Sequence, residues 1–222
     1  MKPIRIWDLP TRIFHWLLAA AVIGLIITGK IGGNAMTWHL RLSYVVFSLL
    51  IFRVIWGLIG GHWSRFATFF PTPARLLGQF RRDPHTGQTP GHSPLGALSV
   101  LAMLTVLALQ IGTGLVADDE IAFSGPLSNL VSGDTVYLAT DYHAELGQLL
   151  VIGLVILHVL AILFYRVFSK KNLTKAMLLG DQLQPPSTPA SRDTPGTRLM
   201  ALVALCVSAA IVYGVVQLGS SA

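Results

Sequence analysis

Five long apolar runs constrain this chain more than any other feature of its 222 residues. A helix rises about 1.5 Å per residue and needs about 20 mostly apolar residues to cross a bilayer. The runs cover residues 13–29, 38–60, 95–117, 143–168 and 199–218. Apolar residues make up 53% of the chain and charged residues only 12%, whereas soluble domains have about 25% charged residues. The sequence therefore predicts an all-α membrane protein with five spanning helices.

A proline-rich stretch separates the fifth run from the other four, which is typical of a linker. We expect a four-helix core over residues 1–180, a linker over 181–198 and an extra transmembrane helix over 199–218. Ser93 and Pro94 have the form of an N-cap followed by a first-turn proline, so the third helix should begin there. The first run also has features of a secretory signal peptide, but its apolar core is longer than such signals usually have.

The positions of Lys and Arg predict the orientation, because short loops that are rich in them stay in the cytoplasm. Thirteen of the sixteen fall on one side: Lys2, Arg5, Arg12, Arg65, Arg75, Arg81, Arg82, Arg166, Lys170, Lys171, Lys175, Arg192 and Arg198. The opposite loops carry Lys30 and an acidic group, Asp118, Asp119, Glu120, Asp134 and Asp141. We therefore expect a multi-pass membrane protein with its amino terminus on the cytoplasmic side and its carboxyl terminus on the opposite side. The net charge of +6 is modest and clustered, so membrane lipid rather than nucleic acid is the expected partner.

Four histidines lie within or at the ends of the apolar runs, where an ionisable side chain is costly and usually functional. His15 lies near the cytoplasmic end of the first run and His39 near the outer end of the second. His143 and His158 lie toward the two ends of the fourth run. The remaining histidines, His62, His85 and His92, lie in the arginine-bearing loop, and we expect them to be solvated.

His143 and His158 are fifteen residues apart, which is about 22 Å along a helix and about 60° around it. Both can therefore face the centre of a bundle. The topology puts His15 at the depth of His158 and His39 at the depth of His143. Two opposed imidazoles are the axial ligands of a six-coordinate b-type haem, and bundle cores are a usual place for one. The pattern predicts two haems, one on His15 and His158 and one on His39 and His143.

Other interpretations of these histidines are weaker. Each could donate a hydrogen bond to a carbonyl on a neighbouring helix, but four histidines matched by depth argue against that. A zinc site needs three or four ligands at one level, and the chain has no HExxH motif. Cys206 is the only cysteine, which excludes an intramolecular disulfide, a cysteine zinc site and CxxCH attachment of haem.

Several aromatic and histidine-containing motifs follow one another along the first four runs. They include Trp7-Asp8, Phe14-His15-Trp16, Trp38-His39, Phe52-Arg53, Gly91-His92-Ser93-Pro94 and Gly112-Thr113-Gly114. In this order they resemble the bacterial cytochrome b561 family, including its hydrogenase-type cytochrome b subunits, over residues 3–180. The resemblance implies a four-helix core with two non-covalent b haems that passes electrons between a quinone and a redox partner. It also implies His15, His39, His143 and His158 as the ligands, whereas the fifth helix departs from the family core.

Two arginines lie within the second run. Arg53 is fourteen residues after His39, so it should lie near the level of His15 and His158. Its guanidinium can bind a haem propionate or extend to the cytoplasmic headgroups, and the sequence leaves both open. For Arg41, near the outer end, we expect an interfacial anchor.

The sequence thus predicts a membrane di-haem cytochrome b that relays electrons between the quinone pool and a periplasmic partner such as a c-type cytochrome. The acidic loop above His143 would steer a basic redox protein, although plain solvation explains it equally well. A stand-alone quinone oxidoreductase that acts on a small species such as superoxide is the alternative within redox chemistry. A haem-free membrane anchor or transporter would use the same histidines as proton relays.

Overall fold

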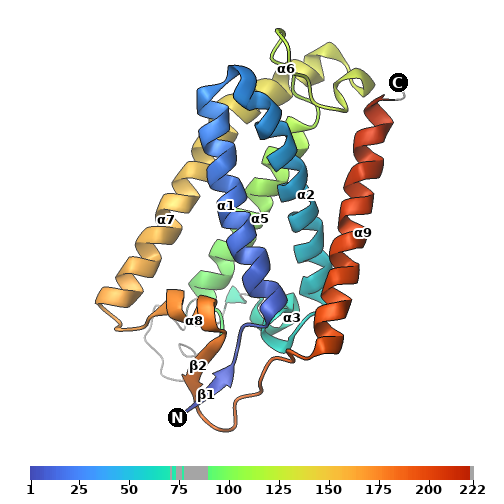
Figure 1. Cartoon of the computed structure of the whole chain (residues 1–222). Helices are drawn as coiled ribbons and strands as arrows, with labels where there is room; N and C mark the ends of the chain where they lie inside the picture. Colours follow the sequence, from blue (N-terminus) through green and yellow to red (C-terminus); the bar gives the residue numbers. More distant parts are fainter. Residues whose placement is uncertain (71, 74–76, 78–89, 221–222) are drawn as a thin grey trace. The chain divides into compact units, whose positions relative to one another are not determined.

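The computed structural model describes residues 1–70, 72–73, 77 and 90–220. Arg75, Arg81, Arg82 and His85, all expected in the cytoplasmic loop, lie outside the described residues. Five helical segments in the described part of the chain are long and apolar enough to cross a membrane (Figure 1). Their main helices are α1 (Leu9–Ile31), α2 (Met36–Ile59), α5 (Pro94–Gly114), α7 (Gln148–Val167) and α9 (Pro195–Ser220). The prediction of an all-α membrane protein with five spanning helices is confirmed.

Side-chain caps decide where two of these helices begin. The Asp8 carboxylate accepts a hydrogen bond of 2.8 Å from the backbone N–H of Thr11, so α1 begins four residues before the first apolar run. Helix α5 begins at Pro94, and the hydroxyl of Ser93 accepts from the N–H of Gly96 at 3.1 Å. The N-cap and first-turn proline expected there are confirmed.

The chain divides into two compact units, which are described separately. The first unit comprises Met1–His15, Arg53–Ala102 and Ile156–Ala204. Strand β1 (Lys2–Arg5) pairs antiparallel with β2 (Asp181–Gln184), with Lys2 opposite Gln184. Its other short elements are η2 (His62–Ser64), α3 (Phe66–Phe69) and α8 (Leu173–Leu179). A small apolar core contains Ile4, Ile6, Trp7 and Ala176.

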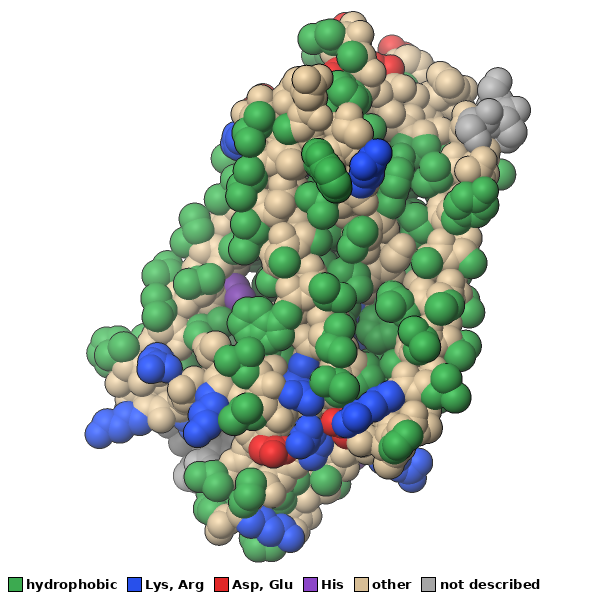
Figure 2. Space-filling model, in the orientation of Figure 1, with side chains coloured by type: hydrophobic (Ala, Val, Ile, Leu, Met, Phe, Trp, Pro, Cys, Tyr) green, Lys and Arg blue, Asp and Glu red, His purple; other side chains and the backbone are tan. Residues whose placement is uncertain are grey.

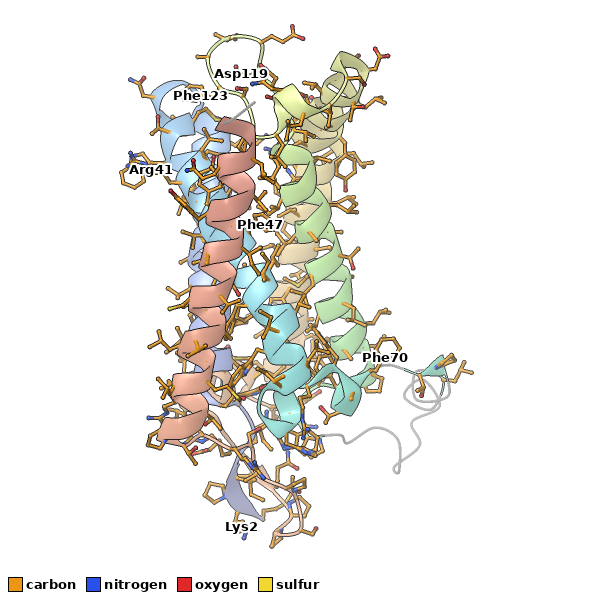
Figure 3. The ribbon with its side chains drawn as sticks, turned by 90° about the vertical axis from the view of Figure 1, so that its right-hand side faces the viewer. Lys2, Arg41, Phe47, Phe70, Asp119 and Phe123 are labelled. Atoms are coloured by element: carbon orange, nitrogen blue, oxygen red, sulfur yellow. The ribbon has the colours of Figure 1, made fainter. Side chains whose placement is uncertain are left out.

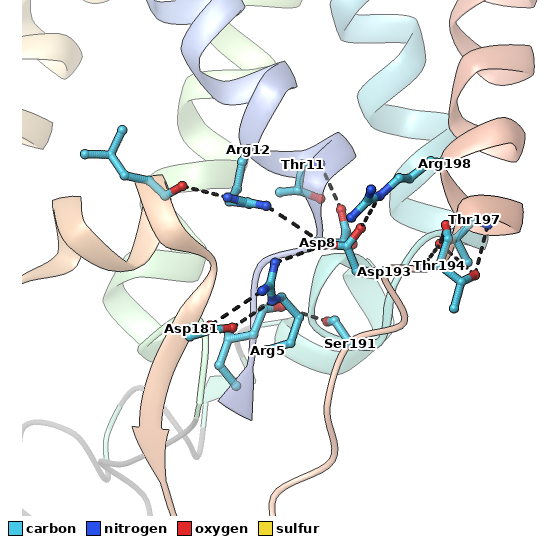
Figure 4. A network of polar contacts seen from close by, with 12 residues as sticks. Arg5, Asp8, Thr11, Arg12, Asp181, Ser191, Asp193, Thr194, Thr197 and Arg198 are labelled. Atoms are coloured by element: carbon cyan, nitrogen blue, oxygen red, sulfur yellow. Dashed lines mark hydrogen bonds and ion pairs between the residues drawn. The ribbon is translucent and has the colours of Figure 1, made fainter. Parts of the chain in front are cut away.

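The stretch expected to serve as a linker makes specific contacts with the start of the chain (Figure 4). The Asp193 carboxylate forms ion pairs with Arg5 at 3.1 Å, Arg198 at 2.8 Å and Arg12 at 3.9 Å. Ser191 donates its N–H to the Arg5 carbonyl at 2.7 Å. The Asp193 carboxylate therefore forms ion pairs with three elements, β1, α1 and α9. Figure 2 shows Lys and Arg side chains gathered at this unit around β1, α8 and the start of α9.

The second unit comprises Trp16–Phe52, Met103–Val155 and Leu205–Ala222. Its buried core is apolar and contains Ala21, Val22, Val46, Leu50, Leu107, Ile111 and Val151. Helix α6 (Gly133–Tyr142) leads into a single π-helical turn, η4 (His143–Gly147), directly before α7. Two 3-10 turns, η1 (Gly33–Ala35) and η3 (Ser128–Leu130), complete this unit.

The acidic loop of this unit is organised by one of its own carboxylates (Figure 3). One oxygen of Asp119 accepts from the backbone N–H groups of Ile121, Ala122 and Phe123 at 2.8 to 3.0 Å. These bonds hold the pKa of Asp119 below its usual value. Asp119 is therefore required for the shape of the loop as well as for its charge.

Candidate haem sites

The first unit brings together two of the four candidate ligands. His15 lies in α1 and His158 in α7, and their imidazole centroids are 6.3 Å apart with ring planes at 51°. The second unit brings together the other two. His39 lies in α2 and His143 begins the π-helical turn, and their centroids are 6.2 Å apart with planes at 80°.

These spacings fit a metal held between two imidazoles. A metal–imidazole nitrogen bond is about 2 Å, and that nitrogen lies about 1.1 Å from its ring centroid, so two axial ligands place their centroids about 6.2 Å apart. Both observed separations agree with this value to about 0.1 Å. In contrast, the described residues contain no group of three or more His, Cys, Asp or Glu side chains that could hold a metal ion. The arrangement therefore suits axial ligation of haem better than a zinc site.

The imidazoles of His39 and His143 are each held through Nδ1 by a backbone carbonyl on a neighbouring helix. The His39 nitrogen lies 3.1 Å from the Leu25 carbonyl oxygen, and the His143 nitrogen lies 2.9 Å from that of Gln110. A carbonyl can only accept, so Nδ1 must carry the proton in both rings. The lone pair is then on Nε2, which leaves that nitrogen available as a metal ligand.

A departure from α-helical geometry accompanies His143. In the π-helical turn each carbonyl bonds five residues ahead instead of four, and such turns are frequent at functional sites. The side-chain amide of Gln110 donates to the His143 carbonyl at 2.9 Å. Gln110 thus holds His143 at two points, its own carbonyl bonding the ring and its side chain bonding the backbone. An added Cβ at Gly147 would collide with the Gln110 amide oxygen, so glycine there makes room for this contact.

Two further glycines lie against the imidazoles of this pair. A Cβ added at Gly114 would lie 2.8 Å from Cε1 and 3.1 Å from Nδ1 of His143. A Cβ at Gly29 would lie 3.3 Å from Cε1 of His39. Both rings therefore pack directly on the backbone of a neighbouring helix, which any larger residue would disturb.

Comparison with known proteins agrees with this geometry. The family profile described as prokaryotic cytochrome b561 matches residues 6–180. The chain belongs to the prokaryotic cytochrome b561 family. It is therefore a multi-pass membrane cytochrome of the b type, with haem b as cofactor and a role in electron transport.

Curated relatives of this cytochrome b561 carry the name probable Ni/Fe-hydrogenase B-type cytochrome subunit. The protein of that name from Bradyrhizobium diazoefficiens is 21% identical over 211 residues, which cover 81% of this chain and 85% of the relative. Proteins of the same name from Cupriavidus necator and Azotobacter chroococcum are 22% and 23% identical, each over 87% of its length and 81% and 80% of this chain. No solved structure gives a significant match.

Arg53 lies in the first unit, as do His15 and His158. Its side chain is only 4% exposed, and the guanidinium carbon lies 4.6 Å from the ring centre of Phe66 and 5.8 Å from that of Phe69. Its Nη1 atom is shielded from solvent and has no hydrogen-bond partner among the described residues. Such an orphaned donor suits an anionic group of a cofactor better than it suits lipid headgroups.

Arg41 differs from Arg53 in being exposed (Figure 3). Its guanidinium lies 5.1 Å from the ring centre of Trp38, in the second unit. An exposed arginine over an exposed tryptophan is typical of an interfacial anchor.

His92 differs from the solvated loop histidine expected from the sequence. Its ring lies 4.7 Å from that of Trp7 and 4.4 Å from that of Phe69, centre to centre. Burial, with a smaller contribution from the Arg53 charge, lowers the pKa of His92 to about 3. The ring is therefore neutral at physiological pH. The only sequence signal for this was its position two residues before Pro94, where the chain must approach the start of α5.

Proposed function

We propose that this cytochrome b561 binds two b haems, one ligated by His15 and His158 and one by His39 and His143, and relays electrons between the quinone pool and a redox partner. The observation that carries the proposal is the separation of the two ring pairs, 6.3 and 6.2 Å. Both values lie within about 0.1 Å of the spacing expected for two axial imidazoles on one iron, and they occur in separate units of the chain.

The protein's part in this function is to hold and orient the ligands. When bound, the haems supply reversible one-electron chemistry. The carbonyls of Leu25 and Gln110 keep Nδ1 of His39 and His143 protonated and Nε2 available. The apolar core of the second unit lies in the same unit as this pair.

Arg53 would bind a propionate of the haem held by His15 and His158. Its buried position and its orphaned Nη1 support this role. Phe66 and Phe69 occupy the space beside the guanidinium and stabilise its charge, which leaves the planar edge to form hydrogen bonds.

The partner would be a redox protein at the membrane face. The relatives' name supports a hydrogenase-type redox subunit, and the acidic loop supports a basic periplasmic protein such as a c-type cytochrome. Glu120 and Asp134 are exposed, and their charges can attract such a protein. The distribution of Lys and Arg supports placement in the bacterial inner membrane, with the amino terminus in the cytoplasm.

Absorption spectroscopy of the purified protein tests the proposal. We expect reduced-minus-oxidised b-type bands and two haems per chain. Replacing His39 or His143 by Ala should remove one spectral component, and replacing His15 or His158 should remove the other. His62→Ala is the matched control, because His62 lies in the short 3-10 turn η2, outside the five spanning segments, and its replacement should leave both components intact.

The outcomes separate the parts of the proposal. A protein without haem would refute it entirely, and one haem per chain would refute the two-site arrangement. Loss of the same component from His15→Ala and His39→Ala would show that the pairing is wrong. The identity of the partner is tested by isolating the protein in a mild detergent and asking whether a c-type cytochrome or a hydrogenase subunit co-purifies with it.

A further inference from the structure

Helix α1 presents a compact polar element to the ring of His39. The Leu25 carbonyl lies 3.1 Å from Nδ1, and the hydroxyl of Thr28, one turn later, lies 3.3 Å from the same nitrogen. Gly29 follows and packs against the ring edge. The Thr28 hydroxyl donates to the carbonyls of Gly24 at 2.7 Å and Leu25 at 3.2 Å, so its oxygen lone pair is available to the imidazole.

Helix α5 presents the same element to the ring of His143. The Gln110 carbonyl lies 2.9 Å from Nδ1, and the Thr113 hydroxyl, three residues later, lies 3.4 Å from it. Gly114 follows and packs against the ring edge. The Thr113 hydroxyl donates to the carbonyls of Leu109 at 2.8 Å and Gln110 at 3.1 Å.

The two elements share one pattern, a carbonyl at position n, threonine at n+3 and glycine at n+4. Threonine in a membrane helix often bonds the carbonyl four residues back simply to satisfy its own hydroxyl. That habit explains the bonds to Gly24 and Leu109. It does not explain why both threonines lie beside the one protonated nitrogen of a candidate ligand, or why glycine follows each of them.

The direction of the hydrogen bonds determines the effect on the ligand. Because the ring proton is on Nδ1, each threonine oxygen acts as a second acceptor for it beside the carbonyl. Acceptors at Nδ1 raise the basicity of the opposite nitrogen. A more basic Nε2 stabilises ferric over ferrous iron, and this lowers the reduction potential.

We propose that Thr28 and Thr113 are positioning residues that lower the reduction potential of the haem held by His39 and His143. This inference rests on the proposed function, because it requires that pair to be the ligands of one haem. Each hydroxyl would act through the imidazole, since it lies beside Nδ1 of the histidine.

Redox titration of the purified, haem-loaded chain tests the inference. Thr28→Val and Thr113→Val keep the side-chain shape and remove the hydroxyl. At a fixed ambient potential each should raise the reduced-to-oxidised ratio of this haem about threefold, and the double variant about tenfold, a shift of about 59 mV for one electron. Thr28→Ser and Thr113→Ser should restore the wild-type potential. Thr105→Val, at an exposed position of α5 on the same helix as Thr113, is the control for replacing threonine by valine in this helix and should have no effect.

The spectral component assigned to His15 and His158 should keep its potential in every variant. An unchanged potential in the double Val variant with both haems bound would overturn the inference and leave the proposed function standing. A shift in the Ser variants as large as in the Val variants would have the same consequence. If Thr113→Val lost the haem, a Thr113→Ser protein with normal haem content and potential would support the role, and the same loss in Thr113→Ser would overturn it. A wild-type protein without haem would refute both proposals.

Discussion

Replacing Gly114 by Ala should selectively weaken haem binding at His39 and His143. The new Cβ would lie 2.8 Å from Cε1 of His143, about 0.6 Å closer than ordinary van der Waals contact, so the ring must withdraw by about that distance. Its 2.9 Å bond to the Gln110 carbonyl would then lengthen to about 3.5 Å, beyond a useful hydrogen bond. Loss of an outer hydrogen bond of this kind typically costs about 10- to 100-fold in metal affinity.

The assay is haem titration of the purified apoprotein, followed by low-temperature spectra that resolve the two components. We expect the affinity of the His39–His143 site to fall about 10- to 100-fold while the other component is unchanged. Gly112→Ala is the matched control two residues away on α5, because an added Cβ there meets no atom within 4 Å. Gly29→Ala should have a smaller effect, since its Cβ would stay 3.3 Å from the His39 ring. Equal haem affinity in Gly114→Ala and Gly112→Ala would refute the reasoning.

Four further results are expected. Arg53→Leu should lower the reduction potential of the haem whose propionate it binds, because a buried positive charge favours the reduced form; an unchanged potential would point to a purely structural arginine. Between about pH 6.5 and 3 the unfolded chain binds a proton at His92 that the folded chain does not, so the wild-type melting temperature should fall with pH in this range. His92→Phe should make this fall smaller, and an equal fall in both proteins would contradict the burial of His92. A reporter fused after Ala222 should be active only in the periplasm, and activity in the cytoplasm would show that the carboxyl terminus lies on the other side of the membrane. Asp118→Asn combined with Glu120→Gln should slow electron transfer to a basic cytochrome at low salt but not at high salt, and equal low-salt rates would exclude this loop as the docking surface.

The membrane architecture could be predicted from the sequence because it depends on local composition. An apolar run of sufficient length forms a helix in a bilayer whatever its neighbours, since the unpaired backbone groups must be satisfied within the segment. The same reasoning selected the four histidines, because depth in the membrane follows from position along a helix of known rise. Their pairing remains a prediction to be tested with the variants above, although the structure brings both pairs to a spacing that fits haem.

Other features arise from contacts between residues that are far apart in the chain. The pairing of β1 with β2 joins Lys2 to Gln184, and neither four-residue strand has a pattern that distinguishes it from a loop. The stretch expected to be a linker also contains Asp193, whose role depends on arginines from β1 and α1. A proline-rich composition carries no information about such partners.

The surroundings of the ligands were likewise decided by the tertiary structure. Gln110 looks like an ordinary polar residue in an apolar helix, and only the packing of α5 against the π-helical turn reveals its two bonds to His143. His92 looks like a loop residue until Trp7 and Phe69 enclose it. The apolar character of a segment depends only on its own residues, so the sequence is sufficient to predict a spanning helix. Hydrogen bonds and ring contacts need atoms from two segments within a few ångströms, and only the folded chain brings those atoms together.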